Sequence, residues 1–114
     1  MILENRRFLR PLLCATILGC TAVDVRAWAE APAQATVVMK DFMFAPMSLT
    51  IRAGSPVTWV NSDDEPHSVV SDTGLFRSGA LDTGERYSFR FDRPGTYHFT
   101  CSIHPRMVGT IVVQ

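Results

Sequence analysis

Residues 86–101, RYSFRFDRPGTYHFTC, decide the fold of this chain. Over 86–91 polar residues alternate with aromatic ones, and the same two-residue period returns over 96–101. A period of two places every second side chain on one face of a β-strand, so each run predicts a strand with its aromatic face buried. Pro94-Gly95 between the runs is a turn signal. The stretch therefore predicts two consecutive strands joined by a short turn.

Short apolar runs continue outward from this stretch. They occupy residues 36–39, 48–52, 56–60, 67–71 and 110–113. Turn signals separate them, and no stretch keeps a helical period for more than a turn or two. Many short strands with regular turns are typical of a β-sandwich or barrel, so the expected fold class is all-β. We expect segment 72–84 to be a loop with at most a weak edge strand.

The inner faces of the expected sandwich share one core. The residues expected on these faces are Val38, Leu49, Ile51, Val57, Trp59, Tyr87, Phe89, Phe91, Tyr97, Phe99, Ile111 and Val113. His98 is out of phase with the aromatic residues on either side, so it should point to solvent. Met39, Met43 and Met47 are expected in the core, as methionines usually are, although Met43 and Met47 could instead line the surface.

The first 29 residues have the features of a secretory signal peptide. An arginine-rich start over 6–10 is followed by an apolar stretch over 11–23, and Ala-Trp-Ala at 27–29 fits a cleavage site. The apolar stretch is shorter than the about 20 residues that span a bilayer. We therefore expect cleavage after residue 29, a flexible segment over 30–35 and one domain over 36–114.

The export route has two alternatives. RRFL at 6–9 is similar to a twin-arginine signal, although the usual spacer after the arginine pair is missing. ILGC at 17–20 is similar to a lipoprotein processing site, in which case Cys20 would carry lipid and tether the domain. All of these routes lead out of a bacterial cytoplasm, so the expected location is the periplasm.

Charge and cysteine content narrow the possible functions. Beyond residue 29 the chain has seven Lys and Arg against nine Asp and Glu, a net charge of −2. No basic stripe is present, so nucleic acid is not an expected partner. The acidic run 63–65 lacks calcium-loop spacing and is expected to be solvated. Cys101 is the one cysteine after the signal, and an odd thiol in an oxidising compartment suggests an intermolecular bond, a reactive group or a metal ligand.

Soft metal ligands accompany Cys101. His104 and Met107 follow it at steps of three, and a tight loop can bring all three side chains to one point. His67 follows Pro66 at the start of an expected strand and can lie at the same end of a sandwich. Two imidazoles, one thiolate and a weak axial thioether are the ligand set of blue-copper electron-transfer sites. The sequence therefore predicts a metal site of His67, Cys101, His104 and Met107.

These residues stand in a sequence that resembles the cupredoxins, the small type 1 copper proteins. The resemblance rests on TWVN at 58–61, PHSV at 66–69, PGTYHFTC at 94–101 and MVGTIVV at 107–113. Within the family, the Cys-x-x-His-x-x-Met spacing is most similar to that of the amicyanins, whose ligand loop is short. The resemblance implies an eight-stranded Greek-key sandwich that holds one type 1 copper per chain on the four ligands named above.

The resemblance also implies roles for neighbouring residues. Asn61 matches an asparagine that fixes the two ligand-bearing loops by hydrogen bonds near the cysteine sulfur. Pro105 matches a proline that packs beside the exposed histidine. Electron transfer is implied through the edge of His104, which would protrude through an apolar patch that includes Pro66 and Ile103. A redox partner such as a dehydrogenase, cytochrome or oxidase would dock there on a monomer.

Two positions depart from the amicyanin pattern. Arg106 stands where an aromatic residue is usual, and Glu65 stands where an apolar one is usual. A methylamine-oxidising partner is therefore not implied.

The expected function is a periplasmic electron carrier that cycles one copper between Cu(II) and Cu(I), with no small-molecule substrate. Enzymatic activity is not expected, because only His98 is left for a further copper centre. The alternative is a copper-binding module for storage, delivery or resistance, which would use the same ligands.

Overall fold

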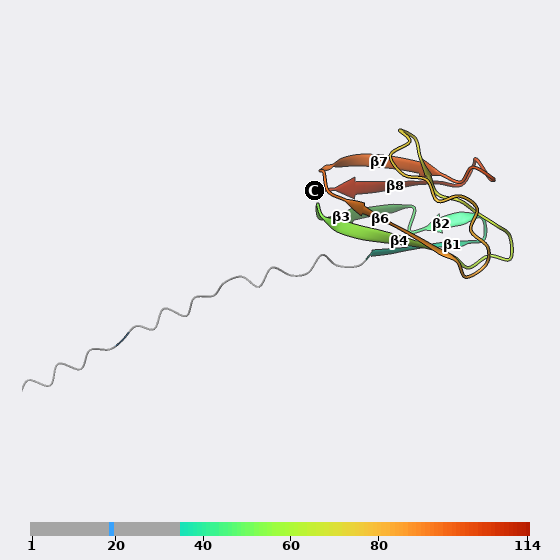
Figure 1. Cartoon of the computed structure of the whole chain (residues 1–114), viewed down its shortest axis with the longest axis horizontal. Coiled ribbons are helices and arrows are strands. Elements are labelled where there is room, and N and C mark those ends of the chain that lie inside the picture. The colour runs from blue at the N-terminus through green and yellow to red at the C-terminus, as the bar shows by residue number, and fades with distance from the viewer. Residues whose placement is uncertain (1–18, 20–34) are drawn as a thin grey trace, which may run out of the picture.

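The computed structural model describes Gly19 and residues 35–114, and the latter form a sandwich of two β-sheets (Figure 1). The strands are β1 (Ala35–Lys40), β2 (Met43–Ala45), β3 (Ser48–Ile51), β4 (Ser55–Asn61), β5 (Val70–Ser71), β6 (Arg86–Phe91), β7 (Gly95–Thr100) and β8 (Val108–Val113). The expected signal peptide, with Cys20, lies outside the described residues apart from Gly19. In the described part of the chain, no helix is long and apolar enough to cross a membrane.

Each sheet has four strands. The first has the order β2-β1-β4-β6, and the second has the order β3-β8-β7-β5. Most neighbouring strands are antiparallel, but β1 runs parallel to β4 and β3 runs parallel to β8. Parallel neighbours need crossover connections, so the chain passes repeatedly from one sheet to the other. The prediction of an all-β sandwich with about eight strands is confirmed.

Trp59 on β4 joins the two sheets through an aromatic cluster. Its side chain has no exposed surface, and its ring centroid lies 5.4 Å from that of Phe99 on β7 and 5.9 Å from that of Tyr87 on β6. Phe76, from the segment between β5 and β6, lies 5.6 Å away. Large aromatic side chains dominate core energetics. The cluster therefore gives the end of β7, where Cys101 follows, a rigid support.

The phase of β1 differs from the prediction. Val37 and Met39 are fully buried, whereas Val38, which was expected inside, is only partly buried. The run TVVM carries apolar residues on both faces, so its sequence does not reveal which face turns inward. Pairing with β4 decides the phase, because Val37 is in register with Trp59 and Met39 with Asn61.

A hairpin that the sequence did not reveal follows β1. Strand β2 pairs antiparallel with β1 and buries Phe44. Alternation along this strand turns Met43 outward, where it is 52% exposed, and Met47 beyond it is 49% exposed. Met43 and Met47 therefore line the surface, which is the alternative that the sequence left open for them, while the prediction that Met39 is a core residue is confirmed.

Segment 72–84 is a loop, as expected, but it also contributes to the core. Phe76 and Leu81 are buried in it. Leu81 forms an isolated bridge with His67, in which the Leu81 N–H donates to the His67 carbonyl at 2.7 Å and the His67 N–H donates back at 3.1 Å. The loop therefore fixes the backbone of one predicted ligand.

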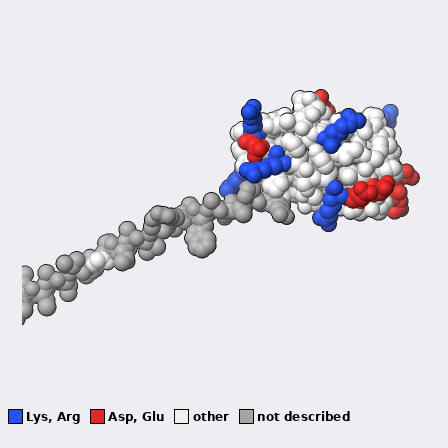
Figure 2. All heavy atoms as spheres, in the orientation of Figure 1, with Lys and Arg blue, Asp and Glu red and all other residues white. Residues whose placement is uncertain are grey.

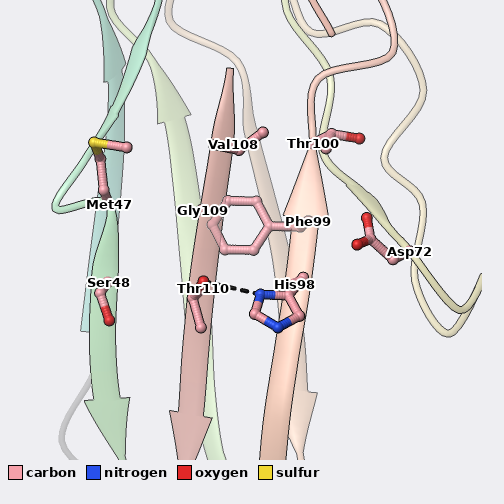
Figure 3. Close-up of a pocket in the computed structure, with 9 residues that line it drawn as sticks. All are labelled: Met47, Ser48, Asp72, His98, Phe99, Thr100, Val108, Gly109 and Thr110. Carbon is pink, nitrogen blue, oxygen red and sulfur yellow. Dashed lines mark hydrogen bonds between the residues drawn. The ribbon is translucent and has the colours of Figure 1, made fainter. Parts of the chain in front are cut away.

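Strands β7 and β8 approach closely at Gly109. The Phe99 ring lies against this glycine (Figure 3), and a Cβ placed there would be 2.6 Å from Cε2 of Phe99. Only glycine leaves room for the ring. On β7 the neighbouring His98 is exposed, as predicted, and its Nδ1 lies 3.0 Å from the Thr110 hydroxyl.

Candidate metal centre

Three of the predicted ligands lie on one short loop at the right-hand end of the sandwich in Figure 1. Cys101 follows β7, His104 lies within the loop, and Met107 directly precedes β8. The Cys101 N–H donates to the Met107 carbonyl at 3.1 Å, and the Met107 N–H donates to the His104 carbonyl at 2.9 Å. These bonds close residues 101–107, here called the ligand loop, on themselves.

His67 reaches the ligand loop from a distant part of the chain. Its Nδ1 lies 4.0 Å from Sγ of Cys101, which is 34 residues away in sequence. Its ring centroid lies 5.0 Å from that of His104. His67 and Cys101 have no exposed surface, and Met107 is also buried. The structure thus brings together the histidine and the thiol on which the predicted site depends.

The donor atoms fit a soft metal ion such as copper. Typical metal–sulfur and metal–nitrogen bonds of about 2.3 and 2.0 Å together exceed the distance between Sγ and Nδ1, so one ion can touch both atoms. Nε2 of His104 is buried without a hydrogen-bond partner among the described residues, as a ligand atom can be. Thiolate, thioether and imidazole are ligands that suit copper.

The predicted ligands are not equally close to one another. Within residues 35–114 no three His, Cys, Asp or Glu side chains form a ready metal cluster. His67 and Cys101 are the close pair, and His104 approaches that pair through the His67 ring.

Ser68, directly after the predicted ligand His67, connects this part of the chain to the ligand loop. Its backbone N–H donates to Sγ of Cys101 at 3.3 Å, and its hydroxyl accepts a hydrogen bond from the Ser102 N–H at 2.8 Å. The two serine hydroxyls are also 2.7 Å apart. An N–H aimed at the sulfur stabilises negative charge there. No sequence motif marks Ser68 as a functional residue; its position directly after His67 is the one available signal.

Asn61 holds different partners from those that the family resemblance implied. Its side-chain amide donates to the carbonyls of Glu65 and Leu81, each at 2.8 Å, and its oxygen accepts from the Asp63 N–H at 2.9 Å. None of these bonds reaches the ligand loop. Asn61 therefore shapes the loop that carries His67, while the hydrogen bond to the cysteine sulfur comes from Ser68.

Asp63 corrects the expectation that the acidic run is merely solvated. Its carboxylate is buried, and Oδ2 lies 2.7 Å from Nε2 of His67. The backbone N–H groups of Asp41 and Phe42 donate to it at 2.7 and 3.0 Å. Burial alone would raise the pKa of Asp63, but the hydrogen bonds from Phe42, His67 and Asp41 outweigh burial and lower this pKa below its ordinary value.

The two N–H groups that donate to the Asp63 carboxylate belong to the turn between β1 and β2. Asp41 and Phe42 both have left-handed backbone angles, with φ of 53° and 58°. Two such residues in succession form the hairpin turn whose twist matches the flanking strands. The turn places the Phe42 ring edge-on to both imidazoles, with centroids 5.4 Å from His67 and 4.9 Å from His104. No sequence pattern indicated this contact.

The surface beside His104 is apolar, as expected, but the histidine does not protrude. Its side chain is partly buried and its Nε2 is fully buried. A cleft of about 380 Å³ next to it is lined by Phe42, Ile103, His104, Pro105, Arg106 and Met107. Pro105 therefore borders the predicted ligand, as the resemblance implied. On the face of the domain shown in Figure 2, acidic side chains lie beside basic ones in two places, and no continuous basic stripe crosses it.

Comparison with known proteins agrees with this fold. The family model for the cupredoxin-like domain matches residues 12–113. Amicyanin-alpha of Methylorubrum extorquens is 37% identical over 91 residues, which cover 75% of this chain and 76% of that protein. Plastocyanin of Scenedesmus fuscus is 44% identical over 85 residues, which cover 63% of this chain and 87% of that protein.

A solved structure shares the architecture. The purple cupredoxin from Nitrosopumilus maritimus superposes with a TM-score of 0.65 at 33% identity, and the match covers 70% of this chain and 99% of that one.

A small β-sandwich with buried sulfur and imidazole groups at one end has the donor atoms that a metal-binding domain needs. This chain belongs to the cupredoxin-like family. The resemblance inferred from sequence is confirmed, and with it copper as the cofactor and a role other than enzymatic catalysis.

Proposed function

We propose that His67, Cys101, His104 and Met107 bind one type 1 copper and that the protein carries single electrons between redox partners. The observation that carries the proposal is the buried contact between Sγ of Cys101 and Nδ1 of His67. Bound copper supplies the one-electron change between Cu(II) and Cu(I). Everything else is done by the chain's own residues, which hold the donor atoms in place.

Asp63 and Ser68 prepare the two closest donor atoms. Because Nε2 of His67 is hydrogen-bonded to Asp63, Nδ1 is the nitrogen that faces the sulfur. A carboxylate on the outer nitrogen fixes the tautomer and increases the basicity of the ligand nitrogen. The Ser68 N–H donates to the sulfur of Cys101 and helps to hold it in place. Both features orient the donor atoms of His67 and Cys101 toward each other.

The ligand loop limits movement between the two oxidation states. Its two internal backbone bonds and its attachment to β7 and β8 hold Cys101, His104 and Met107 in a nearly fixed arrangement. Little rearrangement is then required when an electron arrives or leaves. This rigidity favours a carrier over a module that must release its metal.

The location and the partners follow from the same proposal. The expected signal peptide directs the domain to the periplasm, where redox partner proteins would dock on a monomer at the apolar face beside His104. Phe42 and Ile103, which are 50% and 43% exposed, contribute to that face. The names amicyanin and plastocyanin among the relatives support a redox protein as the partner.

Copper titration tests the proposal. Addition of one equivalent of Cu(II) to the purified protein should produce the intense visible band of thiolate-to-copper charge transfer. Cys101→Ser should abolish the band, and His98→Gln, on an exposed histidine, should leave it unchanged. A wild-type protein that binds one equivalent and stays colourless would overturn the type 1 assignment. A reversible one-electron potential supports the carrier, and ready transfer of copper to an acceptor protein supports the alternative module.

A further inference from the structure

Three rings at the end of the sandwich contact one another edge-on and differ in how exposed they are. Phe42 is half exposed, His104 is partly buried, and His67 has no exposed surface. Phe42 lies edge-on to both histidines, and the histidines lie edge-on to each other at a centroid distance of 5.0 Å. Phe42 is therefore the most exposed ring of the three and touches both of the others.

The backbone of Phe42 is fixed by the carboxylate that fixes His67. The Phe42 N–H donates to Oδ2 of Asp63 at 3.0 Å, and the same oxygen lies 2.7 Å from Nε2 of His67. Phe42 is therefore connected to His67 in two ways: through the carboxylate of Asp63, and through direct contact between the two rings.

The turn adopts an unfavourable conformation to make these contacts. Left-handed φ angles are uncommon for residues other than glycine, and a bulky aromatic residue is a clear outlier there. Such conformations persist when the surroundings determine them, and they are often found at functional sites. Here the surroundings are Asp63 and the two imidazoles.

We propose that Phe42 is a positioning residue for the histidine pair: its ring holds the His104 imidazole against His67 and shields the buried Nε2 of His104 from water. The geometry needs no bound metal. The inference rests on the proposed function only in that the two histidines are there taken as copper ligands.

Chemical modification of histidine tests this role directly. Diethyl pyrocarbonate acylates accessible imidazole nitrogens, and peptide mass spectrometry reports the rate at each histidine. In the metal-free full chain, exposed His98 should react fast, and buried His67 should not react. His104, whose side chain is partly buried and whose Nε2 is fully buried, should react more slowly than His98 in the wild type. Phe42→Ala should raise its rate by about tenfold, as expected for loss of the edge-on aromatic contacts.

Two variants separate positioning from general destabilisation. Phe42→Tyr keeps the ring and should restore protection of His104. Met43→Ala removes a neighbouring side chain of similar exposure and should leave the rate at His104 unchanged. Backbone amide spectra of each variant report whether the fold is retained. If Phe42→Ala unfolds, Phe42→Leu, which keeps bulk without an aromatic ring, gives the same comparison.

Two results would overturn the proposal: His104 reacting as fast as His98 in the wild type, or a rate at His104 that does not change in folded Phe42→Ala or Phe42→Leu. Because the assay uses no copper, either result leaves the copper proposal standing. A colourless copper complex would in turn leave this assay valid.

Discussion

The carboxylate of Asp63 lies 2.7 Å from Nε2 of His67 and thereby determines that Nδ1 of the same ring faces the sulfur of Cys101. The carboxylate also accepts two backbone hydrogen bonds from the turn between β1 and β2. One buried charge thus connects the edge hairpin to the centre of the site.

Replacement of Asp63 should destabilise the metal-free protein. Asp63→Ala leaves the buried Nε2 of His67 without its carboxylate partner and removes the acceptor of two part-buried backbone N–H groups, which should cost about 1–3 kcal/mol of unfolding free energy. Urea unfolding at pH 7 measures this loss. Asp64→Ala, which removes an exposed neighbouring acid, serves as the control and should change stability little.

The same carboxylate predicts a pH dependence. The pKa of Asp63 is lower in the folded chain than its ordinary value, so its contribution to stability is present above the ordinary value of about 3.9 and is lost as pH falls through the folded pKa. The difference in unfolding free energy between wild type and Asp63→Asn should therefore shrink in acid. Equal differences at pH 7 and pH 3 would contradict this prediction.

Ser68→Ala should weaken copper binding while the visible band is retained. The variant keeps the backbone N–H that donates to Cys101 but loses the hydroxyl that bonds to Ser102. Loss of a hydrogen bond that orients a ligand typically lowers metal affinity by about 10–100-fold. Competition with a chelator gives the affinity. Ser88→Ala removes an exposed hydroxyl bonded to Thr58 and should leave the affinity unchanged.

Gly109→Ala should destabilise the sandwich by overpacking. The new methyl group would overlap the Phe99 ring, and forcing such a contact costs about 1–3 kcal/mol. The double variant Gly109→Ala/Phe99→Leu should recover part of this loss, because the smaller side chain leaves space. Additive effects in urea unfolding would show that the two residues do not interfere.

Arg106→Glu should shift the charge preference of electron exchange at the face beside His104 from anionic toward cationic reagents. Oxidation of the copper-loaded, reduced protein by anionic hexacyanoferrate(III) should slow several-fold, and oxidation by a cationic tris-phenanthroline cobalt(III) complex should accelerate. Both changes should diminish as salt is added. Arg93→Glu, in the connection between β6 and β7 at the opposite end, is the matched control. Equal effects from both variants would place the exchange elsewhere.

The sequence was sufficient for the fold class and for the juxtaposition of His67 with Cys101. Strict alternation over β6 and β7 reveals the buried face of each strand. The spacing of His104 and Met107 after Cys101 indicates which side chains belong to the predicted site. Strand β1 shows where this reasoning stops, because adjacent valines leave its phase undetermined until β4 pairs with it. The exposure of Met43 and Met47 was undecided from sequence for the same reason, because the hairpin that turns Met43 outward depends on tertiary contacts.

The residues that support the predicted ligands were not evident from sequence for a different reason. Asp63 has the same appearance as the solvated acids beside it, and only the return of the hairpin brings two N–H groups to its carboxylate. Phe42 contacts histidines that lie 25 and 62 positions further along the chain. Such roles arise from long-range geometry, which no local pattern encodes.

The ligand loop closes on itself through the Cys101 and Met107 backbone bonds before β8 begins. The core cluster around Trp59 therefore gains little from residues 102–106, which are mostly exposed. Laboratory redesign could therefore replace the residues on either side of His104 with others of different polarity, and so alter the surroundings of the centre while the folding cooperativity of the sandwich stays intact.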